Sequence, residues 1–159
     1  MTPIADSVHE TVSAATRKGM RGLAFVQGLA NGTLPLNTIA RTRGYDVIEA
    51  SNGRVTIVAK SNDILLNPAG TMQGGVSTTL HDSRTGPAIQ STLKKHIVPT
   101  TIEFKTSLVR PITTGTGEIR AEGAVLSRGR RIATAKKKMT DRNRRVLTHG
   151  TANCLTFEH

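Results

Sequence analysis

Aromatic residues are scarce in this 159-residue chain, which has no Trp, three Phe and one Tyr. The hydrophobic share is 36%, so a core must be built mainly from Val, Ile, Leu and Ala. Proteins that bind single-stranded nucleic acid stack bases on aromatic side chains placed beside basic residues. The scarcity of aromatics therefore argues against a nucleic-acid partner, although the chain is basic.

Cysteine is reduced to one residue, Cys154. A single cysteine excludes an intramolecular disulfide and any metal cluster built on cysteine spacing. Cys154 lies in an apolar stretch, so we expect it in the core and not as a nucleophile. No metal and no resident cofactor is predicted.

Long hydrophobic runs are also missing. No stretch approaches the roughly 20 apolar residues that a membrane helix needs, and the start lacks a basic segment followed by an apolar run. The length is typical of one domain. We therefore expect a cytoplasmic, soluble protein with no membrane partner.

Acidic residues are few, and the formal net charge is +11. Between Arg128 and Arg145 there are nine basic residues and one acid, Asp141. Such a run is often a solvated face or a protected sheet edge. It can also hold phosphate oxygens, which Arg binds through two parallel hydrogen bonds. Both interpretations remain open from the charge alone.

The stretch 67–86 joins a glycine-containing loop to a predicted helix that bears one acid, Asp82. The adjacent glycines Gly74 and Gly75 permit a sharp entry into the helix and a close approach of a ligand to the backbone. The first N–H groups of a helix favour a carboxylate, a phosphate or a developing oxyanion. An anion site at this helix start is therefore one interpretation, and an ordinary turn is the other.

The spacing of Gly74 and Asp82 limits what one chain can do. Eight helical residues span roughly 12 Å. An oxyanion donor and an acid that acts on the same carbon must both lie within about 3 Å of the reacting group. One helix therefore cannot supply both groups. Two antiparallel copies related by a two-fold axis can, and they form two equal sites.

Three motifs occur in order along the chain. They read N-P-x-G-T-x-Q-G-G-x-x-x-T-L-x-D-S from position 67, T-T-I-E-F-K-x-x-x-x-R-P from position 100, and G-R-R-x-A-T-A from position 129. Together they resemble the hotdog-fold acyl-CoA thioesterases of the phenylacetate-pathway (PaaI-like) family, over about residues 35–157. The resemblance implies an α+β fold in which a curved antiparallel sheet of about five or six strands wraps a long central helix. It also implies dimers that pair further, and hydrolysis of an acyl-CoA substrate at the dimer interface.

The resemblance assigns roles to particular positions. Asn67 lines the acyl pocket, the Gly74 N–H binds the thioester oxygen, and Asp82 is the nucleophile or the general base. A hydroxyl residue orients the water, and Thr101 matches that position best, with Thr100 as its neighbour. The remaining substrate-binding candidates are Gln73 and Gly75 in the loop, and Arg128, Arg130 and Arg131 for the CoA phosphates.

Two residues depart from the family pattern. Gln73 stands where the family has His before the glycine pair, and Gln donates hydrogen bonds but does not titrate. Pro87 stands in the predicted helix, lacks an N–H and favours a kink.

A non-catalytic acyl-CoA-binding protein is the alternative function. A related dehydratase is disfavoured, because its catalytic His has no counterpart in the loop. His81 is adjacent to Asp82, but successive helical residues diverge by about 100°, so His81 is interpreted as structural or exposed.

The patterning predicts the remaining elements. We expect an N-terminal extension at 1–34 with a helix over 13–30, followed by one hotdog domain at 35–159. Strands are predicted over 38–50 and 54–60 with an Asn-Gly turn between them, and then over 100–109, 117–127, 131–140 and 146–157.

Overall fold

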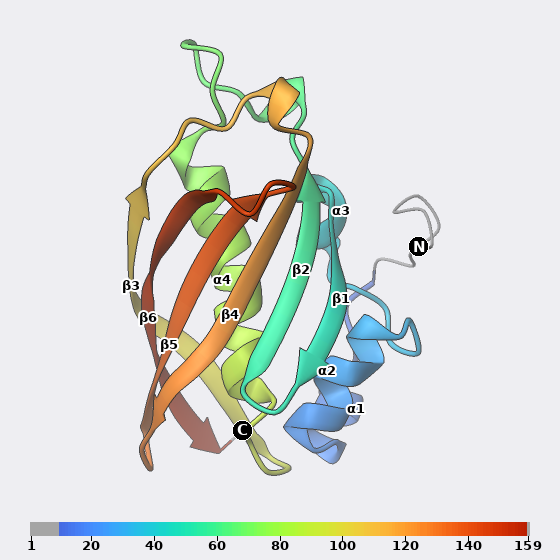
Figure 1. Ribbon diagram of the computed structural model, residues 1–159. Helices are drawn as coiled ribbons and strands as arrows, with labels where there is room; N and C mark the ends of the chain where they lie inside the picture. The colour runs from blue at the N-terminus through green and yellow to red at the C-terminus, as the bar shows by residue number, and fades with distance from the viewer. Residues whose placement is uncertain (1–9, 159) are drawn as a thin grey trace.

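The computed structural model describes residues 10–158 of the chain (Figure 1). In chain order the elements are α1 (Ala14–Gly19), α2 (Gly22–Ala30), α3 (Thr38–Arg43), β1 (Tyr45–Ser51), β2 (Arg54–Lys60), η2 (Asp63–Leu65), α4 (Gly74–Gln90), β3 (Ile97–Leu108), η3 (Thr114–Thr116), β4 (Glu118–Arg128), β5 (Ile132–Asp141) and β6 (Val146–Glu158).

The six strands form one sheet in the order β1-β2-β4-β5-β6-β3, and every neighbouring pair is antiparallel. The sheet curves around α4, which lies along its inner face (Figure 1). The predicted α+β fold with a long helix wrapped by a curved antiparallel sheet is therefore confirmed. The ends of the four later strands differ from the expected ends by at most three residues.

The β1–β2 hairpin forms where the Asn-Gly pair predicts it. Ser51 pairs with Arg54, and Gly53 has a φ of 75°. Glycine adopts this left-handed conformation without steric cost, which suits the tight hairpin turn. β2 covers the expected residues 54–60.

The strand predicted over 38–50 is wrong in its first half, because residues 38–43 form α3. The Asn37 side chain accepts a hydrogen bond from the Ala40 N–H at 3.2 Å and caps the helix start. Gly44 has a φ of 64° and ends the helix in the left-handed conformation. An Asn cap and a terminal Gly are helix signals that outweigh the β-branched residues between them.

The single helix predicted over 13–30 is divided into α1 and α2. Met20 and Arg21 are extended between the two helices. The Gly22 N–H donates to the Leu93 carbonyl at 3.1 Å, and a Cβ on Gly22 would lie 1.7 Å from the Gln90 carbonyl oxygen. The chain therefore bends so that α2 can dock its backbone against the end of α4, a long-range contact that helical periodicity does not reveal.

The core between α4 and the sheet is aliphatic, as the composition predicts. Leu80 of α4 is completely buried, as are the sheet residues Ile57 and Ile119 and, across the sheet, Met139. Val26 of α2 belongs to the same cluster. α4 is continuous from Gly74 to Gln90 although it contains Pro87. This continuous helix sets the position of Asp82 relative to the sheet.

Candidate active site

Asp82 and Thr101 meet at the edge of the helix–sheet interface. The Thr101 hydroxyl on β3 donates a hydrogen bond to Oδ1 of Asp82 on α4, with an O–O distance of 2.7 Å. Asp82 is exposed and Thr101 is half-buried. The hydroxyl fixes one carboxylate oxygen and leaves the other free to accept a proton or to contact a substrate. Of the two candidate hydroxyls, the structure brings Thr101 to the acid, while Thr100 is exposed beside it.

Strand pairing places Thr101 beside Cys154. The two residues are opposite each other in the β3–β6 ladder, and their side-chain oxygen and sulfur lie 3.6 Å apart. The Cys154 side chain is completely buried among Ile89, Leu93 and Ala133. Burial raises the pKa of the Cys154 thiol, so the thiolate is disfavoured. Cys154 is therefore a core residue, as expected.

The backbone N–H of Gly74 is available to a ligand. Gly74 is the first residue of α4, and no atom of the described residues accepts a hydrogen bond from its N–H. Gln73 precedes the helix, and its own N–H donates to the Leu65 carbonyl at 2.9 Å. Gln73 thus contacts the rest of the loop through its backbone, and its side chain makes no capping hydrogen bond. Gly75 is exposed at the same helix start.

Asn67 holds the loop together. Its Oδ1 accepts the N–H groups of Ala69 and Thr71 at 2.9 and 3.2 Å, and its Nδ2 donates to the Thr71 hydroxyl at 3.0 Å. These bonds use the side chain to shape the turn that leads to the glycine pair. A contact between Asn67 and an acyl group remains a prediction.

One chain does not bring the two halves of the predicted site together. Gly74 and Asp82 both lie on the continuous helix α4, so they are roughly 12 Å apart along its axis. Asp82 and Thr101 form one half, and the loop with Asn67, Gln73 and Gly74 forms the other half.

A buried polar network lies directly under this part of α4. The Arg84 guanidinium is completely buried; its Nε donates to the Glu122 carbonyl at 3.0 Å, and its Nη2 bonds to His81 Nδ1. Because Arg84 donates to Nδ1, that nitrogen must accept, so His81 is neutral and carries its proton on Nε2, which faces the Thr148 hydroxyl. Burial, and then the positive charge of Arg84, lower the pKa of His81 far below its usual range. His81 is therefore structural.

Lys137 adds a second buried cation near Asp82. The residue is 2% exposed, its Nζ has no hydrogen-bond partner among the described residues, and the Nζ lies 4.8 Å from the centre of the Phe104 ring. The Lys137 side chain passes over Gly150 of β6, which has no Cβ to obstruct it. A Cβ at position 150 would lie 3.0 Å from the Lys137 Cε. Burial and then Arg84 lower the pKa of Lys137 to about 8, and the negative charge of Asp82 opposes this shift.

Sequence reasoning missed both buried cations. Lys137 is the middle residue of a Lys-Lys-Lys run that resembles a solvated face, and its neighbours Lys136 and Lys138 are indeed exposed. The missed signal is strand alternation, because position 137 is in phase with the buried Ala135 and Met139. Arg84 has a comparable signal, since it lies one helical turn after Leu80 on the buried face of α4.

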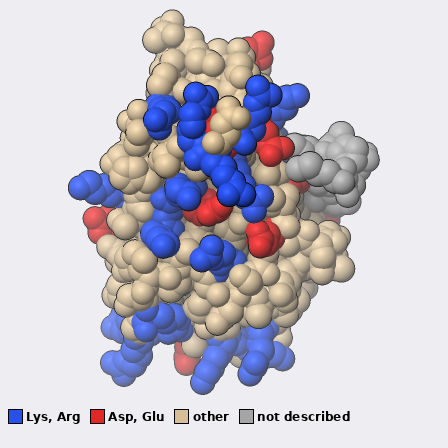
Figure 2. Space-filling view, in the orientation of Figure 1, with Lys and Arg blue, Asp and Glu red and all other residues tan. Residues whose placement is uncertain are grey.

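The three candidate phosphate-binding arginines lie at the other end of the sheet from the glycine loop. Arg128, Arg130 and Arg131 are exposed at the β4–β5 turn, at the lower end of the sheet in Figure 1. Basic side chains gather at this lower end in Figure 2, with few acids among them. On the outer face of the sheet the charges are mixed, and Arg120 pairs with Glu49 and Glu122.

Among residues 10–158, no group of three His, Cys, Asp or Glu side chains is placed to hold a metal ion. None of the helices described there is long and apolar enough to cross a membrane.

Comparison with solved structures settles the fold. A thioesterase family protein from Silicibacter pomeroyi superposes with a TM-score of 0.75 at 20% identity, covering 84% of this chain and 99% of its own length. The chain adopts the hotdog fold. The PaaI protein of the E. coli phenylacetic acid degradation operon gives a TM-score of 0.72 at 14% identity, covering 91% of this chain and 96% of its own. A Streptococcus mutans protein bound to acetyl-CoA gives a TM-score of 0.67 at 19% identity, covering 72% of this chain and 90% of its own length. No family model and no curated protein matches the sequence.

Proposed function

We propose that this protein hydrolyses an acyl-CoA thioester at two equal sites, each built from two copies of the chain. The observation that carries the proposal is the hydrogen bond of Thr101 to Asp82 on the exposed side of α4, together with the unpartnered Gly74 N–H on the same helix. An oriented carboxylate and a free helix-start donor are the two groups that acyl transfer needs.

The bare edge of the sheet supports the two-chain arrangement. β3 is an edge strand of 12 residues, and its apolar residues Ile102, Phe104 and Leu108 are 56%, 48% and 60% exposed. A long exposed apolar edge favours pairing with another chain. Antiparallel pairing of two β3 edges places the two α4 helices side by side in opposite directions, with Gly74 of the partner subunit facing Asp82. Further pairing of dimers into tetramers remains a prediction.

The reaction follows from these positions. The thioester carbonyl oxygen accepts a hydrogen bond from the Gly74 N–H at the positive end of α4. Asp82, oriented by Thr101, takes a proton from water as the water oxygen attacks the carbon. In the alternative route its free oxygen attacks the carbon, CoA thiolate leaves from the resulting anhydride-forming intermediate, and water then hydrolyses the anhydride and supplies the proton. The tetrahedral anion collapses as the carbon–sulfur bond breaks. CoA thiolate leaves and takes up the proton, so the products are the free acid and CoA.

The basic turn suits the nucleotide end of CoA. In the antiparallel dimer the glycine loop of one chain lies toward the β4–β5 end of the other chain. Arg128, Arg130 and Arg131 of the chain that supplies Asp82 are then placed to bind the CoA phosphates. The acetyl-CoA-bound Streptococcus mutans protein has the same fold and supports a CoA thioester as the ligand class.

Release of free CoA thiol from a panel of aryl- and alkyl-CoA esters tests the proposal. The wild type is expected to turn over at least one ester, and Asp82→Asn is expected to lose about a hundredfold or more while remaining dimeric. Turnover that Asp82→Asn leaves unchanged contradicts the proposed role of the acid.

A non-catalytic acyl-CoA-binding protein is the second candidate, and Gln73 favours it because the family has His at this position. The structure shows that Gln73 leaves the helix start intact, since its backbone carries the loop contacts. Tight binding of CoA esters without thiol release from any of them indicates this second function.

A further inference from the structure

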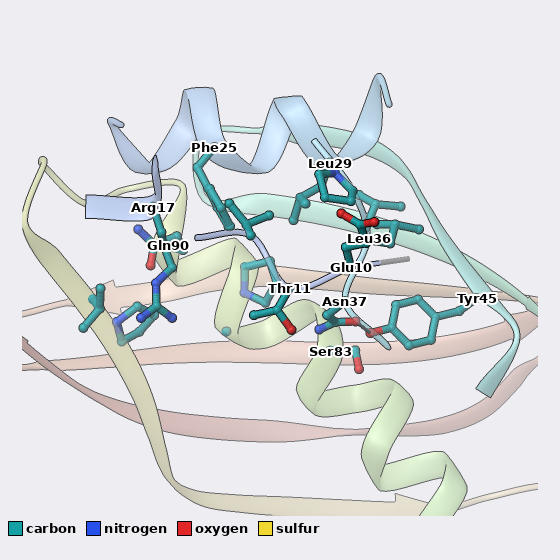
Figure 3. A pocket seen from close by; sticks show the side chains of 17 residues that line it. Glu10, Thr11, Arg17, Phe25, Leu29, Leu36, Asn37, Tyr45, Ser83 and Gln90 are labelled. Atoms are coloured by element: carbon teal, nitrogen blue, oxygen red, sulfur yellow. Dashed lines mark hydrogen bonds between the residues drawn. The ribbon is translucent and has the colours of Figure 1, made fainter. Parts of the chain in front are cut away.

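A cavity of about 300 Å³ lies between the N-terminal helices and the second half of α4 (Figure 3). Its apolar walls include Phe25 and Leu29 of α2, Pro87 of α4 and Val98 of β3. An apolar cavity of about 150 Å³ holds one benzene ring, so this cavity has room for roughly twice that volume.

One end of the cavity adjoins the candidate catalytic pair. Ser83 follows Asp82 on α4, and Tyr45 lies beside Ser83 in Figure 3. Burial raises the pKa of the Tyr45 hydroxyl, and the negative charge of Asp82 raises it further. Tyr45 and Asp82 are therefore close enough to interact electrostatically. Gly86 and Gln90 line the cavity four and eight residues after Asp82, and this spacing places all three on one side of the helix.

The other end of the cavity holds an unpaired cation. Arg17 of α1 and Gln90 lie together at this end (Figure 3). The Arg17 Nε is buried, and no described residue forms a hydrogen bond or an ion pair with the guanidinium side chain. Glu10, the one acid among the lining residues, lies nearer the middle of the cavity, beside Leu36 in Figure 3.

We propose that this cavity binds the acyl chain of the substrate and that Arg17 selects chains that end in a carboxylate. The inference rests on the proposed thioesterase function. Asp82 and Gln90 are eight residues apart on α4, so a thioester carbon at Asp82 and a group at Arg17 are separated by roughly 12 Å. An extended acyl chain of about eight to ten carbons spans this distance and fits the cavity volume.

The charge at the far end explains the selection. A carboxylate pairs with the planar guanidinium through two hydrogen bonds, while the apolar walls contact the methylene groups. A chain that ends in a methyl group covers the same guanidinium but supplies no acceptor for its buried Nε, so it is expected to bind less tightly than a chain that ends in a carboxylate. The cavity therefore discriminates by the terminal group as well as by chain length.

The test compares kcat/KM for two CoA esters with the same eight-carbon chain, one with an unsubstituted end and one with a terminal carboxylate. The wild type is expected to prefer the carboxylate ester by about tenfold or more, a difference typical of a charged hydrogen bond. Arg17→Gln is expected to reduce the preference to about twofold or less, and Arg17→Lys to retain part of it. Arg21→Gln, at an exposed position outside the cavity, is the matched control and is expected to keep the full preference.

Binding of both esters to Asp82→Asn, measured by calorimetry with and without Arg17→Gln, separates this inference from the proposed function. Hydrolysis without a carboxylate preference overturns the selection by Arg17 and leaves the thioesterase function standing. A carboxylate preference in binding that depends on Arg17, with no hydrolysis by the wild type, supports the selection and overturns the thioesterase function. Circular dichroism confirms that each variant is folded.

Discussion

The two edges of the sheet are protected differently. β1 is 7 residues long and is packed against α2. β3 is 12 residues long and leaves Ile102, Phe104 and Leu108 exposed. Both strands carry a bulge, so length and covering distinguish them. Short and covered strands prevent edge pairing, while a long apolar edge invites it. The chain covers one edge with its own N-terminal helices and leaves the other open, and the open edge is the one that we propose pairs with a second copy.

The same division separates two tasks. Thr101 on β3 holds Asp82, so the proposed chemistry lies at the open edge. Tyr45 on β1 and the helices that cover β1 form most of the cavity wall, and Val98 of β3 completes it, so the proposed acyl selection depends mainly on the side of the closed edge. Changes at the open edge should therefore affect turnover and association, and changes at the closed edge should affect which ester is preferred.

Asp82→Asn tests the chemistry at the open edge and is expected to have the largest effect. Amide replacement removes the negative charge that takes the proton, so kcat/KM for the best ester is expected to fall by about a hundredfold or more. Asp63→Asn, at an exposed position in η2, is the matched control and should retain wild-type activity. Retention of more than a tenth of the activity in Asp82→Asn contradicts the account.

Thr101→Ala removes the hydroxyl that orients Asp82. A hydrogen bond to a charged group is worth about 1.5 to 3 kcal/mol, so kcat is expected to fall roughly ten- to a hundredfold. Thr100→Ala changes the exposed neighbouring residue and should have little effect. Equal losses in the two variants, measured by thiol release, are inconsistent with a specific role for Thr101.

Ile102→Lys introduces a charge on the open edge. Sedimentation equilibrium is expected to show dimer association weakened by at least about tenfold, because the pairing surface gains two charges that lose water on association. Ile48→Lys places the same charge on β1, where Ile48 is 37% exposed, and should leave association unchanged. A stronger effect at position 48 reverses the assignment of the two edges.

Lys137→Met affects stability more than association. The folded-state pKa of Lys137 is about 8 and its ordinary value is 10.5, so between these pH values the unfolded state binds more protons. The cost of burying the charge is therefore complete below pH 8 and disappears as the pH rises through 10.5. Lys137→Met is expected to be more stable than wild type at pH 7 by about 1 to 3 kcal/mol.

Chemical denaturation at pH 7 and at about pH 10.5 measures the difference in unfolding free energy between Lys137→Met and the wild type, and this difference should shrink as the pH rises. Lys138→Met, at an exposed position of the same strand, is the control and should change stability little at either pH. A variant at position 137 that is less stable than wild type at pH 7 shows that the lysine gains more from Phe104 and Asp82 than burial costs.

Local signals were sufficient for much of the fold. The Asn-Gly turn and the alternation of residues 54–60 predict β2 and its hairpin correctly, and the glycine pair marks the start of α4. Asp82 and Thr101, chosen from the motifs, are brought into contact by the structure. Each of these features depends on short sequence patterns or on the spacing of the motifs.

Features that depend on distant contacts could not be predicted in the same way. The break between α1 and α2 reflects the docking of Gly22 on Gln90, which no local pattern encodes. Strand alternation indicates that position 137 faces inward, but the room for its long side chain depends on Gly150 of the neighbouring strand. The division of 38–50 into a helix and a strand was locally encoded by Asn37 and Gly44, and was obscured by the β-branched residues between them.

Each proposed site takes Asp82 from one chain and Gly74 from the other, and a mixing experiment tests this arrangement most directly. Gly74→Pro removes the N–H while a proline at the first helical position preserves the helix. Gln73 is already extended, with φ of −56° and ψ of 132°, as a residue before proline must be. Gly74→Pro and Asp82→Asn are each expected to be inactive as homodimers.

When the two variants are unfolded together and refolded as a mixture, half of the dimers contain one chain of each kind. Each mixed dimer has one site with both wild-type residues and one site with neither. The account predicts that thiol release returns to about a quarter of the wild-type rate. If the mixture stays as inactive as its two components while forming mixed dimers, the site is contained within one chain and the account is wrong.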